Sequence, residues 1–247
     1  MSPAPPAGSR RVGSVRSTAA GPRRRVSVLY LYALVGDPPR RSPGRGLRRE
    51  PLAILPLRGF HVVAGRLPAV PAATAAALRR HDATVRRIAA TVDAVLPMRF
   101  GSAVPDARAA VRLLEPRTIE LAGRLAHVRG HEQMTVRVFG PSAPRTSPPT
   151  RSTRAGPGTR YLAARRRAHG APELDPIRPL LDGLVADERV QRHATPPLLA
   201  SVYHLVPRSR RAQYRARLAR AAVRLAPLRL SVSGPWPPYA FGADAWP

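Results

Sequence analysis

The 247-residue chain contains no cysteine and no lysine, and only 5% of its residues are aromatic. Without cysteine there is no disulfide framework, thiolate metal site or cysteine nucleophile. Without lysine there is no phosphate-binding loop of the form G-x-x-x-x-G-K-[ST], and neither G-x-G-x-x-G nor G-x-S-x-G occurs. No apolar run approaches the ~18 to 20 residues that a membrane-spanning helix needs. These absences exclude the commonest nucleotide-binding and serine-hydrolase patterns.

Charge of one sign is abundant instead. All 42 basic residues are arginine and only 14 residues are acidic, which gives a formal net charge of +28. Such a balance predicts anionic partners, and nucleic acid is one of them. Single-stranded nucleic acid binds where basic and aromatic side chains share a surface, whereas here the arginine-rich stretches hold few aromatics. A solvated basic face is therefore the favoured interpretation, and nucleic-acid binding is the alternative.

The distribution of residue types divides the chain into five parts. Residues 1–25 hold serine, alanine, proline, glycine and arginine without acids or aromatics, which predicts a disordered basic extension. Residues 141–159 have the composition of a linker rich in Pro, Ser, Thr and Arg. We expect an N-terminal α+β domain at 26–140, a C-terminal α+β domain at 160–233 and an aromatic, proline-containing tail at 234–247.

Apolar periodicity indicates the elements of the first domain. In Val28–Val35, successive residues point to opposite faces of a strand, and the residues on both faces are apolar. This pattern is typical of a central strand covered on both sides. The further elements expected are a hairpin of Leu52–Leu57 and Phe60–Ala64, a helix from Thr74 that stops at Pro97 with Leu78, Val85, Ile88, Val92 and Val95 on its apolar stripe, a second helical run from Val111 to Val128, and a strand at Met134–Phe139. Pro116 predicts either a kink or a restart of the second run.

The second half also mixes helices and strands. The expected elements are a basic helix at Tyr161–His169, a weaker pattern at Ile177–Val190, a strand at Leu198–Val206, a helix at Arg210–Leu225 with Tyr214, Leu218, Ala221 and Leu225 facing inward, and a strand at Leu228–Val232. Because strands and helices interleave without a sustained strand-helix repeat, the fold class predicted is α+β with two domains.

Candidate catalytic or metal-binding residues are weak. His81 and Asp82 are adjacent, but neighbouring residues on a helix point ~100° apart and no H-E-x-x-H spacing is present. His127 and His131 are four residues apart near a helix end and have no evident third ligand. The few acids are scattered, so we expect no enzyme activity, no metal and no cofactor.

Several segments resemble, in order, the gas vesicle proteins of the GvpF/GvpL type. The most specific are Val95-Leu96-Pro97-Met98-Arg99-Phe100-Gly101 and Gly234-Pro235-Trp236-Pro237-Pro238-Tyr239-Ala240-Phe241. The others are Tyr30-Leu31-Tyr32-Ala33, Gly59-Phe60-His61-Val62-Val63-Ala64, Arg80-His81-Asp82, Val136-Arg137-Val138 and Tyr161-Leu162 with Arg165-Arg166. The chain departs from the family pattern at Met134, where tryptophan is preferred, and at Pro116.

This resemblance implies a two-domain protein whose second domain has a modified ferredoxin-like fold. It also implies a non-enzymatic role in the assembly of gas vesicles, the buoyancy organelles, or as a minor structural component. The implied partners are the major gas vesicle shell protein and other gas vesicle accessory proteins, with no membrane partner, and the implied location is the gas vesicle and the cytoplasm.

The two specific motifs contain the candidate site residues. In the tail, prolines fix φ and favour an extended path, so Trp236, Pro237, Pro238, Tyr239 and Phe241 either contact a partner or plug the crevice between the domains. In the other motif, Leu96, Pro97, Arg99, Phe100 and Gly101 are expected to have structural roles. There Phe100 would be a core anchor, and Arg99 a capping or ion-pairing residue.

Overall fold

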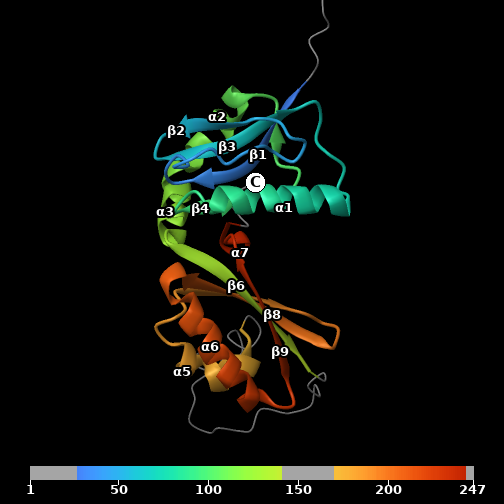
Figure 1. Cartoon of the computed structure of the whole chain (residues 1–247), viewed down its shortest axis with the longest axis vertical. Helices are drawn as coiled ribbons and strands as arrows, with labels where there is room; N and C mark the ends of the chain where they lie inside the picture. The colour runs from blue at the N-terminus through green and yellow to red at the C-terminus, as the bar shows by residue number, and fades with distance from the viewer. Residues whose placement is uncertain (1–26, 141–169, 243–247) are drawn as a thin grey trace, which may run out of the picture.

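The computed structural model describes residues 27–140 and 170–242, which form two lobes, each built on an antiparallel sheet (Figure 1). Four sequence-based expectations lie wholly or partly outside the described residues. They are the extension at 1–25, the linker at 141–159, the helix at Tyr161–His169 and the end of the tail at 243–247. The mixture of helices and antiparallel sheets confirms the α+β fold class.

The first lobe contains a five-stranded sheet in the order β2-β3-β1-β4, with β5 also paired to β1. Its strands are β1 (Val28–Val35), β2 (Leu52–Leu57), β3 (Phe60–Leu67), β4 (Val95–Pro97) and β5 (Ala103–Val104). Every residue of β1 after Val28 is buried. The prediction of a central strand covered on both sides is therefore confirmed, as is the hairpin of β2 and β3.

Helices cover both faces of this sheet. On one face, Tyr30 and Tyr32 pack with residues of α1 (Ala75–Ala89). On the other face, leucines of β1 pack with α2 (Ala107–Leu114) and α3 (Thr118–Val128). Pro116 lies in a single 3-10 turn, η1 (Glu115–Arg117), between these helices. The second helical run therefore restarts at the proline, where a missing backbone N–H costs little.

The end of α1 differs from the prediction. The helix stops at Ala89, and Val95–Pro97 forms β4 instead of the last helical turn. The spacing of Val92 and Val95 fits the stripe of a helix, but it fits a turn followed by a strand equally well. In addition, Pro97 disfavours helical dihedrals at the residue before it. Leu78 is 44% exposed, while His81 occupies the buried stripe in its place.

The second lobe contains a four-stranded sheet in the order β7-β8-β6-β9. Its strands are β6 (His131–Phe139), β7 (Asp187–Arg192), β8 (Leu198–Pro207) and β9 (Arg229–Trp236). Strand β6 lies inside the range 26–140 expected for the first domain, yet all of its partners are in the second sheet. A boundary at 140 would cut that sheet, and the two lobes meet instead at the turn of Arg129 and Gly130.

One face of the second sheet is covered by η2 (Pro172–Ile177), α5 (Arg178–Leu181), α6 (Arg211–Ala222) and η4 (Val223–Leu225). The four inward residues expected for the helix at Arg210–Leu225 are all buried. The weak pattern at Ile177–Val190 becomes α5, a turn and the start of β7. The order of strands and helices along the chain is that of a split β-α-β unit, which favours the ferredoxin-like prediction.

Candidate functional site between the lobes

The C-terminal segment, defined here as Gly234–Gly242, runs from the second lobe to the first. It begins within β9 and ends in α7 (Tyr239–Gly242), which lies between the lobes in Figure 1. Gly234 has φ +123°, and a Cβ there would lie 2.9 Å from the carbonyl oxygen of Gln133. Only glycine fits this close crossing of β6, so the path of the segment depends on it.

Phe241 anchors the segment in the first lobe. Its side chain is 6% exposed and belongs to the core cluster that contains Leu96 of β4 and Leu205 of β8. The adjacent Gly242 lies so close to Leu96 that a Cβ there would be 3.5 Å from the leucine Cβ. One apolar core is therefore continuous across both lobes, and Phe241 lies within it.

A polar network joins the segment to α1. The Tyr239 hydroxyl donates to Asp82 Oδ1 at 3.0 Å, and Arg86 Nε donates to Asp82 Oδ2 at 2.8 Å. The Arg86 guanidinium also lies 4.0 Å from the ring centroid of Trp236, within the range of a cation–π contact. Burial, and next the Asp82 charge, raise the pKa of Tyr239, so the hydroxyl remains a hydrogen-bond donor.

Two further contacts fix the lobes together. The side-chain oxygen of the buried Gln133 accepts the Ala240 N–H at 2.8 Å. Arg208, which follows β8, donates to the carbonyl oxygen of Val92 at 3.1 Å and to that of Ala89 at 3.4 Å, at the C-terminal end of α1. Arginine placed there satisfies carbonyls that have no partner within the helix. No sequence signal marked Gln133, since it sits within an ordinary strand pattern.

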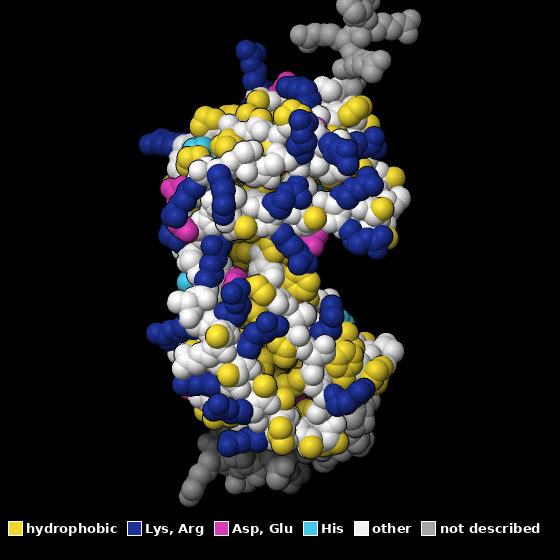
Figure 2. Space-filling model, viewed as in Figure 1, with side chains coloured by type: hydrophobic (Ala, Val, Ile, Leu, Met, Phe, Trp, Pro, Cys, Tyr) yellow, Lys and Arg dark blue, Asp and Glu magenta, His cyan; other side chains and the backbone are white. Residues whose placement is uncertain are grey.

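A cleft of about 300 Å³ opens beside the C-terminal segment. Its walls include Arg86, Val95, Arg208, Arg211 and the run Pro235–Pro238. Pro237 and Pro238 are buried, whereas Trp236 is only half-buried. Figure 2 shows hydrophobic side chains gathered where the molecule is hollowed between its lobes, with arginines around them. The cleft thus presents part of an indole on a rigid, proline-flanked backbone.

The motif at residues 96–101 supports this junction from the first lobe. Leu96 and Pro97 are buried in β4, and Phe100 is half-buried, with its ring edge-on to Tyr30 and His81 at centroid distances of 6.2 and 5.7 Å. Gly101 has φ +92° and donates its N–H to the Tyr30 hydroxyl at 3.0 Å. Arg99 is exposed and makes no ion pair within the described residues, contrary to the capping or pairing role expected.

His81 is a buried hydrogen-bonding residue of this aromatic cluster. Its Nδ1 lies 3.1 Å from the Tyr30 hydroxyl and its Nε2 lies 3.1 Å from the Met98 carbonyl oxygen. Because Gly101 already donates to that hydroxyl, Tyr30 donates to Nδ1, and a neutral ring with the proton on Nε2 satisfies every group. Burial lowers the pKa of His81, which keeps the ring neutral.

This geometry predicts a pH effect on stability. Since the pKa of His81 is lower when the protein is folded, the unfolded chain takes up the proton first and stability falls as the pH drops below about 6.5. The variant His81→Gln should have a shallower decrease between neutral pH and about pH 5. Urea unfolding of both proteins across this range measures the slopes, and identical slopes would contradict the assignment.

His127 and His131 have separate hydrogen-bond partners. His127 Nε2 lies 2.9 Å from Asp187 Oδ2, while His131 Nδ1 lies 2.7 Å from the Arg129 carbonyl oxygen. Within residues 27–140 and 170–242, no group of three or more histidine, aspartate and glutamate side chains is arranged to hold a metal ion. None of the helices described there has both the length and the apolar character that crossing a bilayer requires.

The fold and this junction define a class: two-lobed α+β proteins in which the C-terminal segment joins a first sheet to a second. The family model for gas vesicle synthesis proteins GvpL/GvpF matches residues 28–243. The chain therefore belongs to the GvpL/GvpF family of gas vesicle proteins, as its motifs indicated.

Two solved structures are similar in fold. The gas vesicle protein GvpF from Anabaena sp. PCC7120 has 19% sequence identity and a TM-score of 0.67, covering 87% of this chain and 96% of that one. GvpF from Microcystis aeruginosa has 16% identity and a TM-score of 0.68, covering 87% of this chain and 98% of that one. No curated protein matches the chain in sequence.

Proposed function

We propose that this protein is a non-enzymatic assembly or minor structural protein of gas vesicles that binds the major shell protein in the cytoplasm. The observation that carries the proposal is the half-buried Trp236, held under Arg86 at the mouth of the cleft between the lobes. Family membership supplies the gas vesicle context. Other gas vesicle accessory proteins are further candidate partners.

The chemistry of a self-assembling shell supports this role. A subunit that polymerises through apolar surfaces must be kept soluble before it joins the wall. A binding protein that covers part of those apolar surfaces achieves this. Tryptophan is the side chain most enriched at the centres of such contacts. Flanking prolines restrict the backbone of the segment, so little conformational freedom is lost when Trp236 meets a partner.

In this proposal, some residues of the tail plug the crevice between the domains and another contacts the partner. Phe241, Pro237 and Pro238 are buried and serve the junction between the lobes. Trp236 keeps an exposed part and faces the cleft, so it is the residue proposed to contact the shell protein.

Substitution of Trp236 tests the proposal. Co-purification of the full chain with the major shell protein at high salt should succeed, and Trp236→Ala should weaken the affinity by about thirty-fold, the effect of losing a strong interfacial aromatic. The matched control is Val223→Ala, which removes an apolar side chain that is 80% exposed in the same lobe. Equal capture by Trp236→Ala and the control would overturn the role of Trp236.

A point substitution is sharper here than a truncation. Ending the chain at Ser233 would remove Phe241 from the shared core and the hydrogen bonds of Tyr239 and Ala240 to the first lobe. Loss of capture by such a variant would report misfolding as readily as a lost contact. The Trp236→Ala variant leaves these anchors in place.

A further inference from the structure

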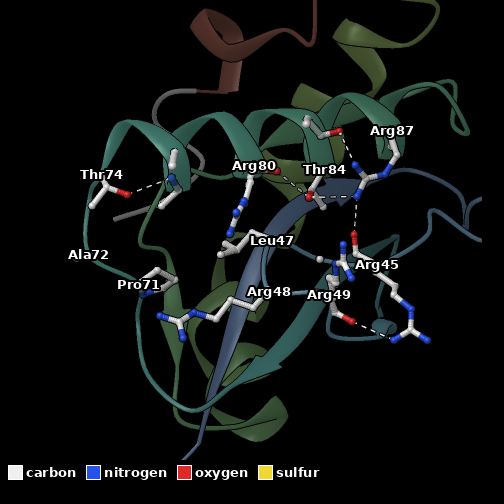
Figure 3. Close-up of a pocket in the computed structure, with 14 residues that line it drawn as sticks. Arg45, Leu47, Arg48, Arg49, Pro71, Ala72, Thr74, Arg80, Thr84 and Arg87 are labelled. Carbon is white, nitrogen blue, oxygen red and sulfur yellow. Dashed lines mark hydrogen bonds between the residues drawn. The ribbon is translucent and has the colours of Figure 1, made fainter.

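A large pocket of the first lobe lies between α1 and the loop at residues 45–49 (Figure 3). Its volume is about 1320 Å³ and it is open to solvent. No residue of the C-terminal segment lines it. It is therefore separate from the cleft to which the proposed function assigns the shell protein.

Positive charge dominates this pocket. Five of its lining residues are arginines and no acidic residue lines it. The arginines are Arg45, Arg48, Arg49, Arg80 and Arg87. Although many other arginines of the protein are paired with acids, none of these five forms an ion pair within the part of the chain that the structure describes. In the described part of the chain, no carboxylate therefore lies within ion-pair distance of these five guanidinium groups.

Hydrogen bonds hold the loop against the helix. The Arg87 guanidinium donates to the Arg45 carbonyl oxygen and, at 3.3 Å, to Thr84 Oγ1. Arg45 Nη1 in turn donates to the Arg49 carbonyl oxygen at 3.0 Å. The walls of the pocket are thus fixed before any ligand arrives, which reduces the cost of ordering them on binding.

Three of these arginines have side chains that make no hydrogen bond within the described residues, namely Arg48, Arg49 and Arg80. Of these, Arg48 from the loop and Arg80 from α1 come from opposite walls of the pocket. Figure 3 shows Arg80 pointing from α1 toward the loop, and Arg48 extending along the pocket toward Pro71. The carboxylate of the nearby Glu50 accepts the Tyr32 hydroxyl and the Arg48 backbone N–H, and within the described residues it forms no ion pair with the guanidinium of Arg48 or Arg80.

The remaining lining distinguishes between classes of anion. Leu47, Pro71, Ala76 and Ala77 line the pocket together with the arginines, whereas no aromatic residue does. Sites for single-stranded nucleic acid use aromatic side chains to stack bases, and no aromatic residue lines this pocket. Guanidinium groups bind carboxylates in bidentate fashion, and alanine and leucine methyls accept aliphatic side chains.

We propose that this pocket binds an acidic peptide segment of a partner protein, with glutamate or aspartate side chains on Arg48 and Arg80 and aliphatic side chains on Leu47 and the alanines of α1. The chain itself is too poor in acids, and too positively charged at +28, to supply that segment to a second copy. This site goes beyond the contact proposed for Trp236 and does not depend on it.

Fluorescence polarisation on the full chain tests the proposal with a labelled synthetic peptide of alternating glutamate and leucine. Arg48→Glu combined with Arg80→Glu should weaken binding by about tenfold or more, since two charge-assisted contacts become repulsive. The matched control combines Arg108→Glu with Arg112→Glu on α2, which packs on the opposite face of the sheet and has the same change in net charge. The control should alter the affinity by less than about twofold, because exposed charges more than a Debye length away are screened.

Three results would overturn the proposal. They are an absence of peptide binding, an equal loss with both pairs of substitutions, and tighter binding of a single-stranded oligonucleotide of equal charge at the same arginines. Thermal unfolding of both double variants verifies that they remain folded. Capture of the major shell protein should be unchanged by Arg48→Glu with Arg80→Glu, so a failure here is distinguishable from a failure of the function proposed for Trp236.

Discussion

Replacing Phe241 with alanine is expected to lower the free energy of unfolding by about 3 to 4 kcal/mol. The side chain is 6% exposed and packs in the cluster that both lobes share, so its loss leaves a cavity between Leu96 and the helices of the first lobe. The cost has two parts, namely the lost free energy of burying the ring and the cavity that the ring leaves behind. Urea denaturation monitored by circular dichroism measures the change.

Phe241→Leu is the control for this prediction. Leucine keeps most of the apolar volume and should cost less than about 1.5 kcal/mol. If Phe241→Ala lowered the free energy of unfolding by less than about 1 kcal/mol, an amount comparable with that for Phe241→Leu, the C-terminal segment would not contribute to the stability of the folded protein. The placement of α7 against β4 would then be contradicted.

The second large effect is expected at Glu188 in the other lobe. Glu188 Oε2 lies 2.8 Å from Arg178 Nη1 and 3.0 Å from His204 Nε2, and the Tyr214 hydroxyl lies 2.7 Å from His204 Nδ1. His204 and Tyr214 are buried, while the Glu188 side chain is 22% exposed. Glu188→Ala should therefore destabilise the protein by about 2 to 3 kcal/mol, since it leaves partly buried donors without their acceptor.

This network also sets a pH dependence. Burial alone would raise the pKa of Glu188, but the hydrogen bonds from His204 and Arg178 outweigh it and hold the pKa below its usual range. The stabilisation is then fully present above the ordinary glutamate pKa near 4.3 and is lost as the pH falls through the lower folded value. Chemical denaturation from about pH 6 to pH 3 should give a steeper loss of stability for the natural chain than for Glu188→Gln.

An unchanged slope in Glu188→Gln would contradict the network. Asp175 offers a matched control, because its carboxylate also accepts from Arg178, at 2.8 Å, but is 65% exposed. Asp175→Asn should change the stability by less than about 1 kcal/mol, as expected for an exposed pair.

Local periodicity was sufficient for elements whose environment repeats along the chain. Strand β1 is apolar on both faces and is buried on both. The stripe of Tyr214, Leu218 and Ala221 identified the buried face of α6. Pro116 marked the restart between α2 and α3, because a proline without an N–H fits the first turn of a helix.

Partner choice between strands could not be predicted in the same way. The apolar pattern of β6 describes a strand but not its sheet, and pairing with β8 and β9 is decided by contacts with residues about sixty or more positions away. Likewise the run from Gly234 to Trp236 was predicted to belong to a proline-containing tail, yet it continues β9 at the edge of the sheet. Proline is tolerated at such an edge because its missing N–H interrupts no interior ladder.

The site was partly predictable for related reasons. The aromatic residues of the tail and the motif at 96–101 were identified from the sequence, and the structure brings Leu96 and Phe241 into one core. The contact of Asp82 and Arg86 with Tyr239 and Trp236 had no signal in the sequence, because an i,i+4 ion pair fits any solvated helix face. The basic pocket had no local signature, since Arg48 and Arg80 meet only through the fold.

The most direct test of the central proposal is the affinity of the full chain for the major gas vesicle shell protein, measured over increasing salt concentration. An apolar contact around Trp236 predicts binding that persists at high salt with a shallow slope of log affinity against log salt. Binding to nucleic acid, by contrast, weakens steeply, with a slope of about −0.9 for each phosphate contact. Failure to bind the shell protein at any salt, with nucleic acid co-purifying and released by salt, would contradict the account.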